Sequence, residues 1–596
     1  MGILQKAVET YDSHKELVGV LREDHAVLAP ISHIITRASI EITIDQDGNF
    51  ISARTVDKSE PKIIIPATEE SAGRASGPRA HPLCDVLEYV SSGNDIKHTL
   101  YVEGLASWAK SEFSNPKLDA VLAYVNGDTI LTDLERSGII TLDENGRFDS
   151  KFEKSIVCWN VIGLGDNSGP CYADASLFRS FIDYYHSKQT MDNEVLCMVS
   201  GENTVAAIQH QKGIVSVYGN ARLISANDSS GFTYRGRFMQ DSEAATVGYE
   251  ASQKAHSALR WLISGQGEYA GGRVFLCWNP HGFKTAPSIG AFMKNVASTV
   301  EPSDYREELK RTLSGYKSEL PNEEDVVIAA FDAATTGRLS VTYYNELRGS
   351  DFLQRLYDWD ERCCWWNYVG EIQPPTLFTI INCAYGTERS ENRLECDDKL
   401  LKQQMQGLLT CRVDKAVFPK EIRKALADRA STPQAFGTNV WRRIVFTACA
   451  VINISEYQRN GDDCMSWELD KHDRSYQFGR LLAVMERAEE DYYRETNEDR
   501  QTSAIKALSV YRQRPWTVYE QVNRQLCTAY LPRIKPWQRT RYQKLTDEII
   551  SIIASFPEEE LNRPLSDIYL MGYDRQRNAF FKSTKNNENE NNNMEE

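Results

Sequence analysis

The stretch "SYQFGRLLAVMERAEEDYYRE" (residues 475–495) decides the fold class of the C-terminal part of the chain. Its apolar residues recur at intervals of three and four, which is the spacing of an amphipathic helix. Four further stretches after residue 397 share this period and are separated by Pro or Gly. They are "FPKEIRKALADRA", "NVWRRIVFTACAVINI", "WTVYEQVNRQLCTAYL" and "KLTDEIISIIASF". The pattern predicts an all-helical bundle over residues 397–581.

Upstream of this bundle, from residue 31 to residue 327, strand-like and helical stretches alternate. The strand-like runs are rich in β-branched and aromatic residues. They are "ASIEITID", "KIIIPA", "RVFLCWN" and "VVIAAF", and the helical stretches include "SLFRSFIDYYHSK" and "SEAATVGYEASQKAHSALRWLI". We therefore expect an α+β fold, with a mixed α/β N-terminal region (residues 1–396) followed by the helical bundle. Residues 582–596 are polar and are predicted to form a disordered tail.

The composition predicts a protein of the reducing cytoplasm. No apolar run of the 596 residues approaches the roughly 20 that a membrane-spanning helix needs. Charged residues interrupt the N-terminal stretch "MGILQKAVETYDSHKEL", which argues against an export signal. The 13 cysteines are scattered without a C-x-x-C pair, so neither a zinc site nor a disulfide framework is indicated. We expect free thiols and no contact with a membrane.

A local excess of positive charge stands out against a formal net charge of -16. The stretch "LPRIKPWQRTRYQK" (residues 531–544) holds five Lys or Arg residues and no acid. From residue 506 to residue 544, Glu520 is the only acidic residue beside nine basic ones. Such a face can bind phosphates, and interleaved rings could stack on unpaired bases. The alternative for the rings Tyr511, Trp516, Tyr519, Tyr530, Trp537 and Tyr542 is packing in the core of the bundle.

Two N-terminal loops carry the same kind of chemistry. "EESAGRASGPRAHPLCDVLEYV" (residues 69–90) places Arg74 and Arg79 among glycines, which allow backbone to approach a phosphate closely. "QKGIVSVYGNARLISANDSSGFTYRGR" (residues 211–237) adds cations and amides. These are Lys212, Asn220, Arg222, Asn227, Arg235 and Arg237. Arginine forks and amide side chains can read base edges, whereas the alternative is an ordinary surface loop.

No stretch predicts an active site. The dipeptide His472-Asp473 lacks the further His and Asp ligands of a metal phosphohydrolase, and Asp473 stands where a helix starting near residue 475 would take its cap. The acidic cluster of Asp358, Asp360 and Glu361 could hold Mg²⁺, but a solvated turn explains it as well. "GLGDNSGP" (residues 163–170) lacks the spacing of a phosphate-binding loop. We expect no catalytic residue, no metal and no cofactor.

Five segments between residues 76 and 581 carry a family resemblance. They are "SGPRAHPLCDVLEYV", "VSGENTVAAIQHQKGI", "TTGRLSVTYYNELRGSDFLQRL", "YQFGRLLAVMERAE" and "MGYDRQRNAFF". On these segments the chain resembles the large subunit of the type I-C CRISPR surveillance complex, Cascade (the Csd family). The resemblance covers nearly the whole chain.

The resemblance implies a non-enzymatic role in which base pairing to a guide RNA reads most of the target sequence. The large subunit is expected to recognise the protospacer-adjacent motif, to aid R-loop formation and to recruit the helicase-nuclease. The implied partners are CRISPR RNA, double-stranded target DNA with its displaced strand, the Cascade backbone and repeat-processing subunits, copies of a small subunit, and the helicase-nuclease.

By the same resemblance, residues 1–396 are assigned to motif sensing and complex assembly. Their candidate nucleic-acid-binding residues are Arg74, Arg79, Lys212, Asn220 and Arg222. The cations of the bundle are expected along a displaced or guide-paired strand. They are Arg512, Arg514, Arg524, Arg533, Lys535, Arg539 and Arg541. Arg480 and Arg575 lie inside matching motifs and are expected in structural ion pairs.

The bundle also resembles the small subunit of other Cascade complexes, which can arise by internal translation. Met465 stands in a polar linker before the matching helix, so residues 465–596 could also be made as a separate small subunit. A plain linker methionine is the alternative. Two rival functions stay open for the whole chain: a metal-dependent nuclease of phage defence, and a scaffold that binds only proteins.

Overall fold

The structure is a computed structural model, and it describes residues 2–21, 26–74, 77–92, 94–189, 194–224, 246–282, 298–319, 324–389 and 392–580. Two compact units divide the chain. The N-terminal unit comprises residues 1–269, 273–285 and 325–346, and the C-terminal unit comprises residues 270–272, 286–324 and 347–596. This grouping by contacts places residues 347–396 with the helical bundle, whereas composition divides the chain at residue 396.

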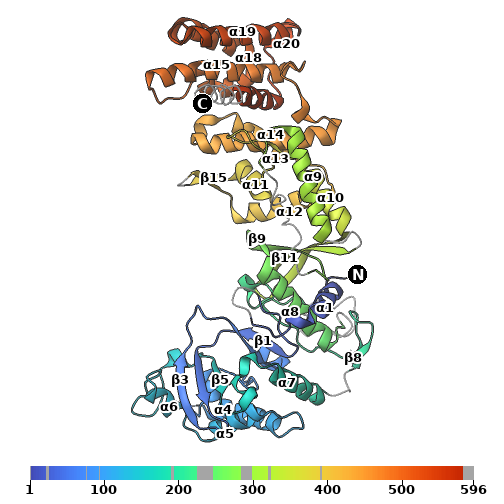
Figure 1. The fold of residues 1–596 in the computed structure, drawn as a ribbon, viewed down its shortest axis with the longest axis vertical. Helices are drawn as coiled ribbons and strands as arrows, with labels where there is room; N and C mark the ends of the chain where they lie inside the picture. Colours follow the sequence, from blue (N-terminus) through green and yellow to red (C-terminus); the bar gives the residue numbers. More distant parts are fainter. Residues whose placement is uncertain are drawn as a thin grey trace, which may run out of the picture. The chain divides into compact units, whose positions relative to one another are not determined.

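The N-terminal unit is a mixture of sheets and helices, as the α+β prediction requires (Figure 1). Its main helices are α1 (Ile3–Ser13), α4 (Asp95–Ala109), α5 (Pro116–Asn126), α6 (Ile130–Arg136), α7 (Ala175–Lys188) and α8 (Tyr249–Gln266), with the short α2 (Glu69–Ala72) and α3 (Leu87–Val90). Its strands are β1 (His33–Thr36), β2 (Ile40–Ile44), β3 (Phe50–Thr55), β4 (Ile63–Pro66), β5 (Val157–Val161), β6 (Gly169–Pro170), β7 (Glu194–Leu196), β8 (Asn203–Val205) and β10 (Arg273–Trp278). The strands β9 (Glu268–Ala270), β11 (Asp325–Thr335) and β12 (Arg338–Arg348) complete the set. All four predicted strand runs are strands.

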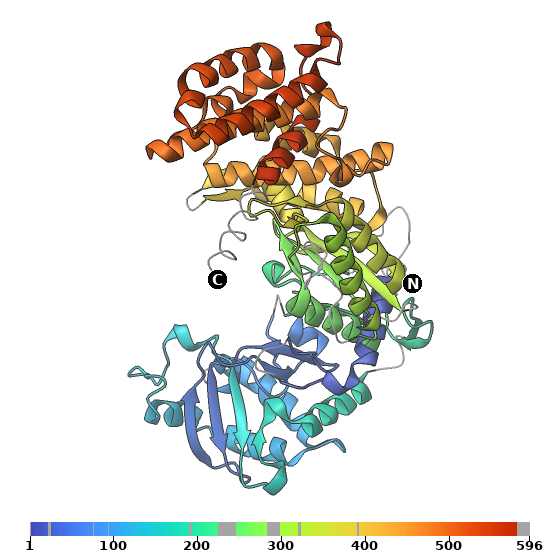
Figure 2. The ribbon, with the colours of Figure 1, turned by 45° about the horizontal axis from the view of Figure 1, so that its top comes forward.

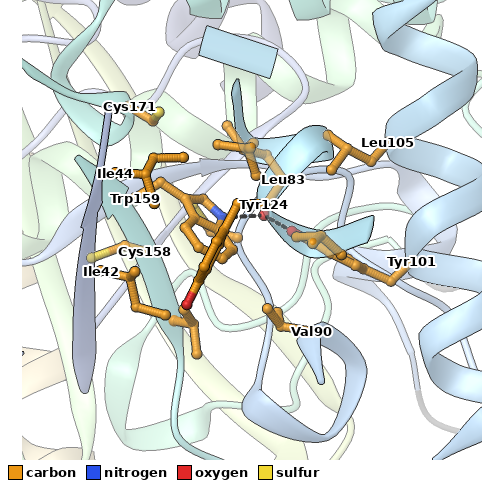
Figure 3. Packing of buried hydrophobic residues seen from close by; sticks show 14 of the residues in the cluster. Ile42, Ile44, Leu83, Val90, Tyr101, Leu105, Tyr124, Cys158, Trp159 and Cys171 are labelled. Carbon is orange, nitrogen blue, oxygen red and sulfur yellow. Dashed lines mark hydrogen bonds between the residues drawn. The ribbon is translucent and has the colours of Figure 1, made fainter. Parts of the chain in front are cut away.

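One four-stranded sheet has the order β3-β2-β5-β6 (Figure 2). β2 pairs with β3 in antiparallel and with β5 in parallel orientation, so the chain crosses over between β3 and β5 through α3–α6. Isoleucines of β2 and residues of α4 and α5 share one hydrophobic core with Trp159 of β5. Two buried side chains, Trp159 and Tyr101, donate to the carbonyl of Leu83 at 2.9 and 2.6 Å (Figure 3). The loop before α3 is thereby anchored to this core.

A second sheet has the order β12-β11-β10-β9, in which β10 and β11 are antiparallel with Val274 opposite Phe331. α8 packs on this sheet with the face that its 3–4 periodicity predicts. Tyr249, Ser252, His256, Leu259 and Ile263 are all buried. β1 and β4 form a separate antiparallel pair, with Ile34 opposite Ile65. The long hairpin of β11 and β12 turns at residues 336–337.

The C-terminal unit is dominated by helices, and every described element after residue 395 is helical. The helices of the whole C-terminal unit are α9 (Pro302–Glu319), α10 (Gly349–Arg362), α11 (Leu377–Tyr385), α12 (Asp398–Asp414), α13 (Lys420–Ala430), α14 (Thr438–Asn460), α15 (Arg474–Thr496), α16 (Ser503–Lys506), α17 (Leu508–Gln513), α18 (Pro515–Gln525), α19 (Pro536–Ile553), α20 (Glu558–Leu561) and a last helix over residues 568–580. Two short hairpins interrupt them, β13 (Trp365–Trp366) with β14 (Ile372–Gln373) and β15 (Thr387–Arg389) with β16 (Arg393–Glu395). None of the described helices is long and apolar enough to cross a membrane.

Two glycines determine how closely α15 and the last helix cross. A Cβ atom on Gly479 would lie 1.9 Å from the carbonyl oxygen of Tyr569, and one on Gly572 would lie 2.0 Å from that of Tyr476. No larger residue fits at either position, because backbone atoms cannot move aside as a flexible side chain can. The two resembling segments "YQFGRLLAVMERAE" and "MGYDRQRNAFF" therefore form one helix crossing.

Candidate nucleic-acid interface

A surface cavity of about 690 Å³ lies within the N-terminal unit, and most of its charged lining residues are cations. We call it the basic groove, and its charged lining side chains are Arg37, Lys58, Lys62, Lys212, Arg260 and Glu60. Among the described lining residues the one carboxylate is that of Glu60, and it is neutralised by Arg54, whose Nη1 lies 2.8 Å from Glu60 Oε1. In the described part of the chain, none of the five cations of the groove forms an ion pair. The basic groove therefore carries an excess of positive charge that would attract an anion.

Three elements position these cations. Arg37 follows β1 and donates to the carbonyl of Lys58, which lies in the loop between β3 and β4. Arg260 of α8 donates to the carbonyl of Lys212 at 2.7 Å and so holds the loop that carries this lysine. Gly213, with φ of 69°, allows that loop to close, since a Cβ atom there would lie 2.9 Å from the carbonyl of Gly219. Burial lowers the pKa of Arg260 to about 10, so it remains charged at neutral pH.

Beside the groove, backbone pairing brings three further cationic positions together. Arg222 forms an antiparallel bridge with Lys212 and a parallel bridge with Arg338 at the tip of the β11–β12 hairpin. The Arg222 amide donates to the carbonyl of Gly337 at 3.1 Å, and Leu339 donates back to Arg222 at 2.9 Å. Partial burial, together with the charges of Arg222 and Arg74, lowers the pKa of Lys212. This grouping is costly for the protein alone, and a bound phosphate would relieve it.

Arg74 and Arg79 differ sharply. Arg74 donates to both carboxylate oxygens of the buried Asp85, at 2.6 and 3.0 Å, and lies over the ring of Tyr89 at 4.9 Å. Arg79 is half exposed and pairs with the exposed Glu70 at 2.7 Å, a contact of small energy. The guanidinium of Arg74 holds the loop in shape, whereas that of Arg79 is accessible.

The remaining loop residues are partly described. Asn220 is exposed, two residues before Arg222. Gln209 Oε1 accepts a hydrogen bond from Arg222 at 3.4 Å, and a Cβ atom on Gly73 would lie 2.2 Å from that same oxygen. The loop of Arg74 thus approaches the loop of Arg222 through a glycine. Asn227, Arg235 and Arg237 lie outside the described residues.

The seven candidate cations of the bundle fall into two groups. Three have acidic or aromatic neighbours: Arg512 with Asp428 at 2.5 Å, Lys535 with Glu495 at 3.8 Å, and Arg541 over the ring of Phe580 at 5.2 Å. The other four are exposed and form no ion pair in the described ranges. They are Arg514, Arg524, Arg533 and Arg539. Arg533 donates to the hydroxyl of Tyr492 at 3.4 Å.

Most rings of the basic stretch belong to the core, as the packing alternative predicts. Tyr511, Tyr519, Tyr530 and Tyr542 are buried, and the half-buried Trp516 packs on Tyr519 with ring centroids 5.4 Å apart.

Trp537 differs from these rings, because 58% of its surface is exposed. On α19 it shares a face with Arg541 and Lys544, four and seven residues further on. One exposed ring flanked by cations on one helix face suits a base of single-stranded nucleic acid.

The buried carboxylates in the first part of the acidic stretch that begins at Glu486 point inward, and of its described residues only Glu495 pairs with a candidate cation, Lys535. Glu486 forms an ion pair with Arg577, Glu489 accepts from the Ser503 amide at 2.7 Å, and Asp491 accepts from Gln538 at 3.1 Å. Helix α15 therefore directs its carboxylates to the last helix, to α16 and to α19.

Residues that suggested a metal enzyme have structural partners. Asp473 caps α15 by accepting from the Tyr476 amide at 2.8 Å, as predicted. The expectation of a solvated turn around Asp358 is wrong, because these residues belong to α10 and form ion pairs. Asp360 is buried and pairs with the buried Arg412 at 3.0 Å. Across the described ranges, no three His, Cys, Asp or Glu side chains cluster in a way that could hold a metal.

The two arginines expected in ion pairs have different environments. Arg480 is fully buried, lies 3.2 Å from Glu548 and donates to the side chain of Gln576 at 2.9 Å, which confirms its structural role. Arg575 forms no ion pair with a described residue, and its guanidinium instead stacks on Trp366 at 4.2 Å.

Sequence reasoning missed Arg37, Lys58, Lys62, Arg260 and Arg338, because no charge run surrounds them. The one available signal was Arg338, which stands inside the segment "TTGRLSVTYY".

Comparison with known proteins gives one informative result. The family described as CRISPR-associated protein (Cas_Csd1) matches residues 9–581, which is nearly the whole chain. A search of curated proteins found no match. The chain therefore belongs to the Csd1 family of CRISPR-associated proteins.

Proposed function

We propose that this chain is the non-catalytic large subunit of a type I-C CRISPR surveillance complex, which senses the motif flanking a DNA target and promotes R-loop formation. Membership in the Csd1 family supports a role in a CRISPR system. The observation that carries the proposal is the basic groove with the adjacent cluster of Lys212, Arg222 and Arg338. The molecule has a net charge of -16, yet the lysines of the groove form no ion pair with a described carboxylate.

Within this surface the roles divide by geometry. Lys58, Lys62 and Arg37 suit phosphates, because they are exposed on the rim of the groove. Arg222 and Asn220, held by the short ladder to the hairpin tip, are the side chains we assign to the flanking bases. Arg74 acts as a positioning residue through Asp85. The exposed face of α19 contacts the displaced or guide-paired strand, and the chain recruits the helicase-nuclease through a surface that we do not assign.

The test is target binding by the assembled, RNA-containing complex. Charge reversal of Lys212 and Arg222 to Glu should weaken binding of duplex DNA roughly tenfold per residue and lower its salt dependence. Lys154→Glu is the matched control, since Lys154 is exposed in the same unit and does not line the groove. Unchanged affinity of the double variant would overturn the assignment of the groove.

Motif reading needs a separate measurement. Asn220→Ala and Arg222→Ala should change the ratio of affinities between duplexes with matched and mismatched flanks. Arg74→Ala should instead lower the melting temperature, because it leaves the buried Asp85 unpaired. Equal losses on both flanks would contradict motif reading by these residues.

The non-catalytic role has its own test. The complex should leave target DNA uncut with Mg²⁺ until the helicase-nuclease is added. Cleavage that His472→Ala abolishes would favour the nuclease. In the structure, His472 Nε2 lies 2.9 Å from the hydroxyl of Ser555, and the His472 ring packs on that of Phe556.

We also propose that residues 465–596 are made separately as a small subunit. Met465 lies in a short turn just before α15, so such a product would begin with that helix and its cap, Asp473. A C-terminal tag should then reveal a second, shorter band. Persistence of that band in Met465→Leu would refute this start site.

A further inference from the structure

A second cavity, of about 440 Å³, lies within the C-terminal unit and is lined by none of the candidate nucleic-acid-binding residues. Its wall includes Tyr368, the dipeptide Pro374-Pro375 and the adjacent arginines Arg442 and Arg443. None of the described side chains that line it is a carboxylate. We call it the Tyr368 pocket. Its volume is within the range of pockets that hold small ligands, about 300–1,000 Å³.

The tyrosine is presented by a rigid turn. Tyr368 lies between β13 and β14, and 73% of its surface is exposed. The side-chain oxygen of Asn367 accepts from the amides of Val369 and Glu371, both at 3.0 Å, and the Asn367 amide donates to the carbonyl of Glu371 at 2.8 Å. An exposed ring on a fixed turn loses little conformational entropy when a planar group stacks on it.

Two buried tryptophans anchor that turn to the unit. Trp365 donates from Nε1 to Asp574 at 2.8 Å, and Trp366 donates to the carbonyl of Val300 at 2.9 Å. The hairpin is therefore part of the core, so the position of Tyr368 does not depend on a bound partner.

The arginines come from α14. Arg442 is exposed, and Arg443 donates one hydrogen bond from Nη2 to the carbonyl of Asn392 at 3.1 Å. Neither forms an ion pair with a carboxylate in the described part of the chain. The charge of Arg442 acts electrostatically on Glu490, but Glu490 forms an ion pair with Arg577, at 3.1 Å. Two arginines that line the pocket are thus available to an anion.

We propose that the Tyr368 pocket binds one nucleotide of single-stranded nucleic acid, with its base stacked on Tyr368 and its phosphate on Arg442 and Arg443. The amides of Gln373 and Asn439, which also line the pocket, offer both donors and acceptors to a base edge. This inference rests on the proposed function, because it assigns a further contact for the guide RNA or the displaced strand. Tyrosine and arginine also occur in protein interfaces, so a protein segment is the competing occupant.

The decisive experiment places a photoreactive benzoylphenylalanine at position 368 in the purified, RNA-containing complex. Irradiation with and without target DNA should attach this position to RNA or to a DNA strand. The matched control is the same group at Val417, which is 75% exposed in the same unit and does not line the pocket. Attachment only to another protein subunit, or no attachment above the control, would overturn the proposal.

A binding measurement supports this test. Purified full-length chain is titrated into fluorescein-labelled ten-residue oligouridylate and oligothymidylate. Tyr368→Ala should weaken binding roughly tenfold, since a stacked base is lost, while Tyr368→Phe should keep most of the affinity. Arg442→Glu with Arg443→Glu should also weaken it and flatten its salt dependence. Equal affinity of Tyr368→Ala and the unchanged chain would refute stacking.

The outcomes separate this inference from the proposed function. A complex that contains RNA and binds its target, but shows no nucleic-acid attachment at position 368, refutes the pocket alone. A complex without RNA refutes the proposed function. Variants of Lys212 and Arg222 should leave the pocket's attachment to RNA unchanged.

Discussion

The cations of the basic groove in the N-terminal unit and the buried arginines of the C-terminal unit have opposite environments. In the C-terminal unit many arginines form ion pairs within the fold: Arg412 pairs with Asp360, Arg480 with Glu548 and Arg423 with Asp567 at 2.6 Å. In the N-terminal unit the groove lysines form no ion pair with described carboxylates. The comparison teaches that the pairing of cations, and not their density along the sequence, indicates where an anionic partner binds. The most cationic stretch of sequence is therefore only partly available for binding.

The units also differ in their buried titratable groups. Burial lowers the pKa of His33, His81 and His210 to about 4 and that of His256 to about 3, and all four belong to the N-terminal unit. In the C-terminal unit burial instead raises the pKa of Asp574 to about 6. A lowered histidine pKa makes the unfolded state bind more protons, so stability is lost as the pH falls from about 6.5 toward 4.

The largest expected effect is therefore selective acid unfolding of the N-terminal unit. At pH 5 each of the four histidines removes up to about 2 kcal/mol of stability. Glu69, whose pKa burial raises to about 7, offsets about one of them, because its raised pKa stabilises the fold as the pH falls. Calorimetry of the full chain should show a transition that moves to lower temperature between pH 7 and pH 5.

Hydrogen exchange assigns that transition to a unit. Faster exchange at pH 5, corrected for the intrinsic rate, should be concentrated in α8 and β10. An equal loss of protection in α14 and α15 would contradict selective acid unfolding of the N-terminal unit.

The next largest effect concerns the helix crossing in the C-terminal unit. Gly479→Ala and Gly572→Ala should each cost about 3 kcal/mol or more, because the added methyl group would meet a backbone carbonyl at about 2 Å. Thermal unfolding monitored by circular dichroism measures the loss. Gly407→Ala in α12 is the matched control, since nothing lies within 4 Å of its added Cβ atom. A loss as large in the control would contradict the close-crossing argument.

The smallest expected effect concerns two cations of α19. Reversal of Arg539 and Arg541 to Glu should weaken DNA binding by the assembled complex by about 1–2 kcal/mol, similarly for all sequences, because in the proposed function these cations contact phosphates. Arg512→Glu should affect stability more than binding, since Arg512 pairs with Asp428. Filter binding on matched and unrelated duplexes, with melting temperatures of each variant, distinguishes the two. Sequence-dependent losses would argue against phosphate contacts.

Local periodicity predicted the elements well because it records which face of a helix or strand is buried. The runs around Ile42, Ile64, Leu276 and Ala329 are strands, and the buried face of α8 is the predicted one. The prediction of a solvated turn at the acidic cluster around Asp358 is wrong, because the cluster belongs to a helix whose charged residues have partners far along the chain. Lys415, for example, pairs with Asp358 at 2.9 Å. Such partners leave no local trace in the sequence.

The sequence by itself determined the α+β class, the helical C-terminal part and, through five matching segments, the family. Only the tertiary structure decided which cations are available. Pairing depends on distances between residues that can be far apart in the chain: Arg74 reaches Asp85, whereas Lys212 lies beside Arg222, which in turn pairs with the tip of a hairpin more than 100 residues later. The energy of a charge is set by the neighbours and the burial that folding gives it, and neither can be read from composition.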